Sequence, residues 1–147
     1  MKIAGIILRW VYGLFYLYIG GSWIWHLLVG KLWITPPEPP PAKALTAAFT
    51  ASGLVDPMVA GTCLVGGLLL LVQRTAPLGI AVLAPLVTGI FLFHLLLSGG
   101  WVWGAAHLGI LIVLAWLHRS AFRPLWSYRA VGRADWKGLG ASLSGGD

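Results

Sequence analysis

The chain has 147 residues, of which 59% are hydrophobic and only 10% are charged. Soluble domains carry charge on about a quarter of their residues, so this composition excludes a soluble globular domain, a disordered chain and a fibrous protein. The formal net charge of +6 rests on ten basic and four acidic residues, which is too sparse for a nucleic-acid-binding surface. In a membrane protein such a bias instead reflects orientation and contact with anionic lipid.

Four segments meet the requirement of about 20 mostly apolar residues for a transmembrane helix. They run from about 10–30, 54–72, 78–97 and 101–117. The sequence therefore predicts an all-α protein in which residues 1–126 form an integral membrane bundle of four helices. A basic, Gly/Ser-rich tail follows over residues 127–147.

The connections between these spans differ in length. The last two are tight hairpins, whereas the first is a long, proline-rich loop over residues 31–53. Its residues 35–41 (TPPEPPP) are predicted to be extended and polyproline-like, because proline blocks helix formation. Residues 42–52 then have apolar positions at helical spacing, which predicts a short amphipathic helix at the outer interface.

The distribution of basic residues predicts the orientation. If the N-terminus is cytoplasmic, four spans return the C-terminus to the cytoplasm, and only Lys31 and Lys43 lie outside. The other eight lie inside, as the positive-inside rule requires: Lys2, Arg9, Arg74, Arg119, Arg123, Arg129, Arg133 and Lys137. After the last span the chain is expected to turn along the inner surface at Pro124. There Arg and Trp side chains are expected to contact lipid headgroups, namely Arg119, Arg123, Trp126 and Arg129.

Small residues recur at close spacing within the spans. Examples are Gly100-x-x-x-Gly104 and Ala105-x-x-x-Gly109 in the fourth span, with Gly61, Gly66 and Gly67 in the second. Helices in lipid associate through close packing at such residues. We favour packing within the bundle over a docking groove for another subunit. Pro85 lies in the middle of the third span and is expected to kink it.

Histidines are the candidate binding residues. No acidic or basic residue is expected centrally in a span, which disfavours a proton pump or a charged ion path. His26, His94 and His107 fall in the outer half of three different spans, with Tyr18, Ser22 and Ser98 as the nearest partners by spacing. Together they could donate a hydrogen bond to a quinone carbonyl or, as neutral imidazoles, ligate a metal or haem b. For haem, His26 and His94 are the best pair, because they lie at the same predicted depth in the membrane. The alternative is that each histidine only bonds a neighbour.

No catalytic residue and no metal site is assigned. The sequence lacks a phosphate-binding loop, a nucleophile elbow and a zinc motif. Cys63 is alone and lies mid-span in an apolar setting, so it is interpreted as a packing residue.

Several short motifs resemble the DoxX-like family of small bacterial membrane proteins. They are Gly66-Gly67-Leu68 ahead of Arg74, Leu83-Ala84-Pro85, Phe93-His94, and Phe122-Arg123-Pro124-Leu125. The resemblance covers the chain to about Trp126 and implies a four-helix bundle in the bacterial cytoplasmic (inner) membrane. Some members are similar to small subunits of quinone-linked oxidoreductases, such as thiosulfate:quinone oxidoreductase. Relatives often carry Glu and Asn where this chain has Cys63 and Gly89, and a second Glu near Leu111, so the resemblance favours an accessory role over catalysis.

Three functions therefore remain open. The first is a non-catalytic accessory or structural subunit of a membrane redox or energy-transducing complex, with other membrane subunits and the lipid bilayer as partners. The second is a quinone- or haem-binding redox protein that uses the outer histidines. The third is a small transporter, which the absence of charges within the spans disfavours.

Overall fold

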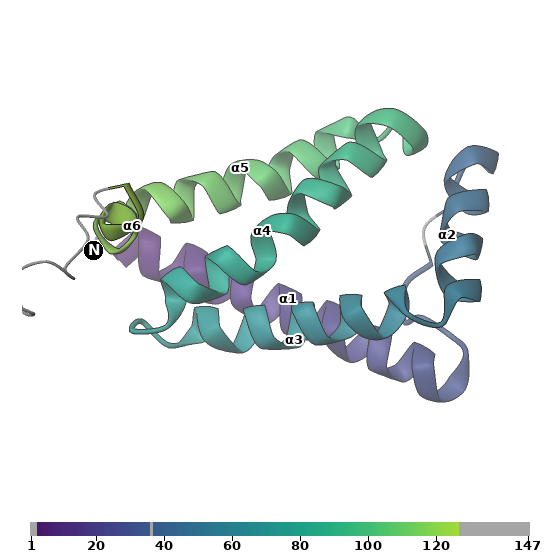
Figure 1. The fold of residues 1–147 in the computed structure, drawn as a ribbon, viewed down its shortest axis with the longest axis horizontal. Helices are drawn as coiled ribbons and strands as arrows, with labels where there is room; N and C mark the ends of the chain where they lie inside the picture. Colours follow the sequence, from purple (N-terminus) through teal and green to yellow (C-terminus); the bar gives the residue numbers. More distant parts are fainter. Residues whose placement is uncertain (1–2, 36, 127–147) are drawn as a thin grey trace, which may run out of the picture.

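The computed structural model describes residues 3–35 and 37–126, which are helical with no strand in those ranges (Figure 1). The elements are α1 (Ile3–Val29), α2 (Pro40–Ser52), α3 (Val55–Leu71), α4 (Ala76–Phe93), the π-helical segment η1 (His94–Ser98), α5 (Trp101–Leu117) and α6 (Arg119–Trp126). The all-α prediction is confirmed. The predicted second, third and fourth spans match α3, α4 with η1, and α5 to within two residues, whereas α1 begins seven residues before the predicted first span.

The four long helices pack in two pairs. α3 lies antiparallel along α1, and α5 lies antiparallel along α4 (Figure 1). α4 joins the pairs by packing on α3 near one end of the bundle, the end that α6 occupies. Toward the opposite end, where α2 crosses, the α4–α5 pair diverges from the α1–α3 pair. We refer to these as the α6 end and the α2 end.

Glycines allow the close contacts between helices. A methyl group added at Gly67 would stand 2.9 Å from the Gly13 carbonyl oxygen of α1, and one at Gly79 would stand 2.9 Å from that of Gly66. At Gly104 in α5 it would stand 2.9 Å from the Cα of Phe91 in α4. For Gly66, Gly67 and Gly104, these contacts confirm the interpretation as packing sites within the bundle. Gly61, Gly89 and Gly109 are different, because an added methyl group there would meet no atom within 4 Å.

Short helices turn away from the bundle at both ends. The axes of α2 and α3 differ by 91°, and those of α5 and α6 by 80°. α2 begins at Pro40, so the extended prediction for residues 35–41 is wrong at its last two positions, because proline fits the first turn of a helix. The bend after α5 is at His118, and Pro124 lies inside α6 instead of at the predicted turn. A proline late in an eight-residue helix disturbs few backbone hydrogen bonds, so the helix continues through it.

The described helices include membrane-spanning candidates. α1 with 27 residues and the 23-residue segment Ala76–Ser98 are each long and apolar enough to cross a bilayer. α3 and α5 have 17 residues each and meet the same test only when each is joined with its bent neighbour. By length and composition, residues 3–35 and 37–126 therefore hold two such helices, or up to four if each bent pair is one span.

Candidate functional site

A cavity of about 840 Å³ opens where the two helix pairs diverge. Side chains from α1, α2, α3, α4 and η1 line it, and nearly all of them are apolar. Its volume falls within the range of about 300–1,000 Å³ that is typical of small-molecule sites. The polar side chains on its walls are Glu38, Thr46, Asp56, Thr62 and His94, with the thiol of Cys63 beside them.

Two small residues in α4 border the cavity. Pro85 and Gly89 are four residues apart and share one face of the helix. Gly89 has no side chain, and an added Cβ there would meet no atom within 4 Å. Gly89 therefore leaves open space beside the cavity, unlike Gly79 of the same helix, which packs against α3.

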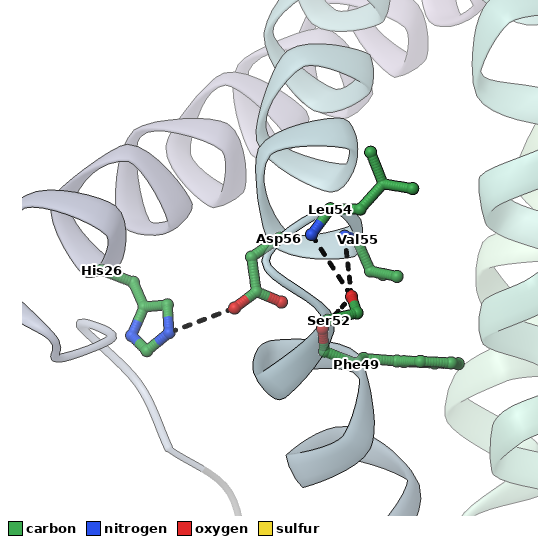
Figure 2. Close-up of polar contacts among 6 residues, drawn as sticks. All are labelled: His26, Phe49, Ser52, Leu54, Val55 and Asp56. Carbon is green, nitrogen blue, oxygen red and sulfur yellow. Dashed lines mark hydrogen bonds and ion pairs between the residues drawn. The ribbon is translucent and has the colours of Figure 1, made fainter.

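Asp56 lies at the α2 end of the cavity, in the first turn of α3 (Figure 2). Its side chain is only 6% exposed, and Oδ2 lies 3.5 Å from Nε2 of His26 on α1. Ser52 shapes the bend ahead of it, because its Oγ accepts the backbone N–H groups of Leu54 and Val55. A negative charge is favoured at the N-terminus of a helix, so α3 itself stabilises the carboxylate of Asp56.

His94 has a defined tautomer when its ring is neutral. Its Nδ1 lies 2.8 Å from the backbone carbonyl oxygen of Ile90. A carbonyl only accepts hydrogen bonds, so Nδ1 carries the proton and Nε2 presents a lone pair. The ring lies on the cavity wall at the start of η1, and π-helical turns are frequent at functional sites.

A second polar cluster lies between α1 and α5. The hydroxyl of Tyr12 donates to the backbone carbonyl of His107 at 2.9 Å, and the hydroxyl of Tyr16 lies 3.4 Å from Nδ1 of His107. The rings of Phe15 and Trp103 enclose the imidazole, with centroid distances of 4.9 Å and 4.7 Å. These contacts satisfy the buried polar atoms of the two tyrosines and fix the position of His107.

Arg9 occupies the α6 end of the interior. It is 3% exposed, and its Nη1 donates to the backbone carbonyl of Leu70 at 2.6 Å. Leu70 lies in the last turn of α3, where the carbonyl groups carry the negative end of the helix dipole. Arg9 and Asp56 lie near the ends of their helices, so they do not contradict the expectation that no charge lies centrally in a span, but both are buried, which the sequence did not predict. Arg9 shares a helical face with Tyr12 and Tyr16, and this stripe is the signal in the sequence that could have revealed it.

The predicted histidine cluster is only partly assembled. His94 lies near enough to His107 for an electrostatic interaction between them, but His26 pairs with Asp56 instead. The predicted partners of the histidines also differ. Ser22 accepts the backbone N–H of Trp33, and the ring of Tyr18 packs on Trp33. Ser98 bonds backbone groups, donating to the carbonyl of His94 and accepting the N–H of Gly100. The equal predicted membrane depth of His26 and His94 therefore did not determine which helix faces contact each other.

The predicted lipid-contacting residues lie at the α6 end. The guanidinium of Arg119 stacks 4.8 Å from the ring centroid of Trp116, and both Arg119 and Arg123 are exposed. α6 ends at Trp126, whereas Arg129 lies outside the described residues. Contact of these side chains with lipid stays a prediction.

A comparison of the chain with protein-family models, curated proteins and solved structures finds no match. The residues that the structure describes also hold no group of three or more His, Cys, Asp or Glu suited to a metal ion. What the cavity offers is a large apolar volume with hydrogen-bonding groups at one end. Such an arrangement suits an amphiphile whose polar head group lies at the α2 end.

Proposed function

We propose that this protein is a DoxX-like membrane protein that binds a lipid-soluble amphiphile of the quinone type as an accessory component of a redox complex. The observation that carries the proposal is the 840 Å³ cavity, whose apolar walls end at Asp56 and His94. A quinone or quinol likewise has an apolar part, its chain, and a polar part, its ring. The apolar walls would hold the chain, and the α2 end would hold the ring.

The proposed placement has four spans, with α2 at the outer interface and both termini in the cytoplasm. Helices of 17 residues reach the lower limit of about 17–25 residues for crossing a bilayer, which supports counting α3 and α5 as spans. α2 and α6 lie nearly perpendicular to their neighbours, as surface helices would. Exposed arginines at the α6 end, Arg74, Arg119 and Arg123, favour the cytoplasmic side for that end. The resemblance points to the bacterial cytoplasmic membrane.

An accessory role is favoured over catalysis. Cys63 and Gly89 lie on the cavity wall where relatives often carry Glu and Asn, so the polar side chains expected at these two positions are missing. Haem ligation by His26 and His94 has less support, because His94 lies on the cavity wall whereas His26 does not. The protein would hold the amphiphile within reach of a partner subunit, and that subunit would carry the redox centre.

A calorimetric titration tests the binding. The purified protein in nanodiscs is titrated with a decyl-substituted benzoquinone, and the signal of empty nanodiscs is subtracted. Gly89→Phe fills the cavity, whereas Gly109→Phe adds the same side chain to α5 at a position that does not line the cavity. We expect saturable binding that Gly89→Phe weakens at least tenfold and Gly109→Phe leaves unchanged. Equal affinity in both variants, or partitioning without saturation, would refute the proposal, and a Soret band in the purified protein would favour haem instead.

A further inference from the structure

The hydrogen-bonding groups at the α2 end of the cavity are mostly acceptors. His94 presents the lone pair of Nε2, because its Nδ1 proton is committed to the Ile90 carbonyl. Asp56 adds a carboxylate with two oxygen atoms, of which Oδ2 faces His26 (Figure 2). Glu38 adds a second carboxyl group to the same end of the cavity. An occupant would therefore meet acceptors from three different segments of the chain.

Donors near this end are already engaged. Thr46 donates its hydroxyl proton to the backbone carbonyl of Ala42 at 3.0 Å, which leaves only lone pairs on its oxygen. At the start of α3, the N–H groups of Leu54 and Val55 donate to Oγ of Ser52. Pro57, in the first turn of the helix, has no N–H group to donate. Three further side chains on the wall carry donor groups.

These donors are the indole of Trp23, the hydroxyl of Thr62 and the weakly donating thiol of Cys63, next to Thr62 in α3. Thr62 lies six residues along α3 from Asp56, which is about 9 Å at a rise of 1.5 Å per residue. It is therefore nearer the part of the cavity that would hold the apolar chain. At the α2 end, acceptors outnumber donors.

We infer that the cavity selects a head group that donates hydrogen bonds, and thus binds the hydroxyl-bearing quinol more tightly than the carbonyl-bearing quinone. This inference rests on the proposed binding function and adds the redox state of the ligand. A quinol donates one hydroxyl to the carboxylate of Asp56 and the other to Nε2 of His94. A quinone has only acceptors, so it donates no hydrogen bond to the buried carboxylate of Asp56 or to Nε2 of His94, which costs affinity. Both forms have the same apolar chain, so the difference comes from the head group.

The experiment compares two probes with one chain. Decyl hydroquinone, kept reduced under argon, and decyl benzoquinone are titrated into the nanodisc-embedded protein by calorimetry. We expect the hydroquinone to bind at least tenfold more tightly. Asp56→Asn replaces an acceptor with a donor, and His94→Phe removes an acceptor, so each should reduce the ratio below about threefold. The control Met58→Ala alters the apolar wall and should weaken both probes while keeping the ratio.

The outcomes separate the inference from the proposed function. If both probes bind saturably with equal affinity, the cavity binds amphiphiles but the preference for the quinol is refuted. If neither probe binds saturably, the proposed function itself fails. A decylammonium ion serves as the third probe. If it binds more tightly than the hydroquinone, the site recognises a positive charge and not a hydroxyl donor, and the inference is overturned.

Discussion

Two glycines in the same helix should respond oppositely to the same substitution. Gly67 and Gly61 both lie in α3, six residues apart. A methyl group at Gly67 would stand 2.9 Å from the Gly13 carbonyl oxygen and 3.0 Å from the Leu17 backbone nitrogen. A methyl group at Gly61 would meet no atom within 4 Å. Gly67→Ala therefore forces α1 and α3 apart, whereas Gly61→Ala leaves the packing unchanged.

The expected magnitudes follow from two effects. Alanine is favoured over glycine by about 1 kcal/mol in a helix interior, and this gain applies at both positions. Overpacking costs about 1–3 kcal/mol, and the upper part of this range applies where backbone atoms must move. We therefore expect Gly67→Ala to lower the free energy of unfolding by about 1–2 kcal/mol and Gly61→Ala to raise it by up to about 1 kcal/mol.

Unfolding in mixed micelles measures this difference. The free energy of unfolding is obtained by titrating sodium dodecyl sulfate against a mild detergent and following helicity by circular dichroism. The two variants should differ by about 2–3 kcal/mol, since the propensity gain is common to both and the steric cost applies to one. Equal effects within about 0.5 kcal/mol, the size of ordinary surface substitutions, would refute the close approach of α1 and α3 at this glycine.

Three further predictions concern the polar cluster, the bend and the orientation. Tyr12→Phe should lower the free energy of unfolding by about 1 kcal/mol through loss of its bond to the His107 carbonyl; the control Tyr18→Phe, on an exposed ring, should have almost no effect. Ser52→Ala should destabilise the start of α3 by about 1 kcal/mol, so amide hydrogen exchange should accelerate there and not in the rest of the helix. Reporter fusions should place the C-terminus in the cytoplasm and the loop before α2 outside, and an external signal from the C-terminus would contradict the proposed orientation.

The sequence was sufficient for the helices but not for their contacts. The lengths of the apolar segments predicted the bounds of α3 and α5 to within one residue at each end. This was possible because a span requires a continuous run of apolar residues, which can be read directly from the sequence. Spacing identified the packing glycines Gly66, Gly67 and Gly104, but it also selected Gly61 and Gly109, which face open space. Which faces meet depends on the angular position of every helix, and His26 shows the consequence. Its depth matches that of His94, yet its ring faces Asp56 on α3.

The charges in the interior were missed for a related reason. Arg9 and Asp56 lie near the ends of apolar segments, where a charged side chain ordinarily reaches the interface. Arg9 instead turns inward because the last carbonyl groups of α3 lie beside it and accept its hydrogen bond. Asp56 turns inward because His26 and the first turn of α3 favour its carboxylate. Both partners come from another helix or from a helix end, so neither is visible in a local pattern.

Photochemical labelling tests the central claim most directly. A decyl quinone bearing a diazirine on its chain is photolysed with the protein in nanodiscs, and the labelled residues are identified by mass spectrometry. We predict saturable adducts on cavity-lining residues such as Thr62, Leu86 and Phe93, which the unlabelled quinone suppresses. Adducts that do not saturate and that spread equally over exposed apolar residues away from the cavity, such as Leu14 and Ile112, would contradict the account.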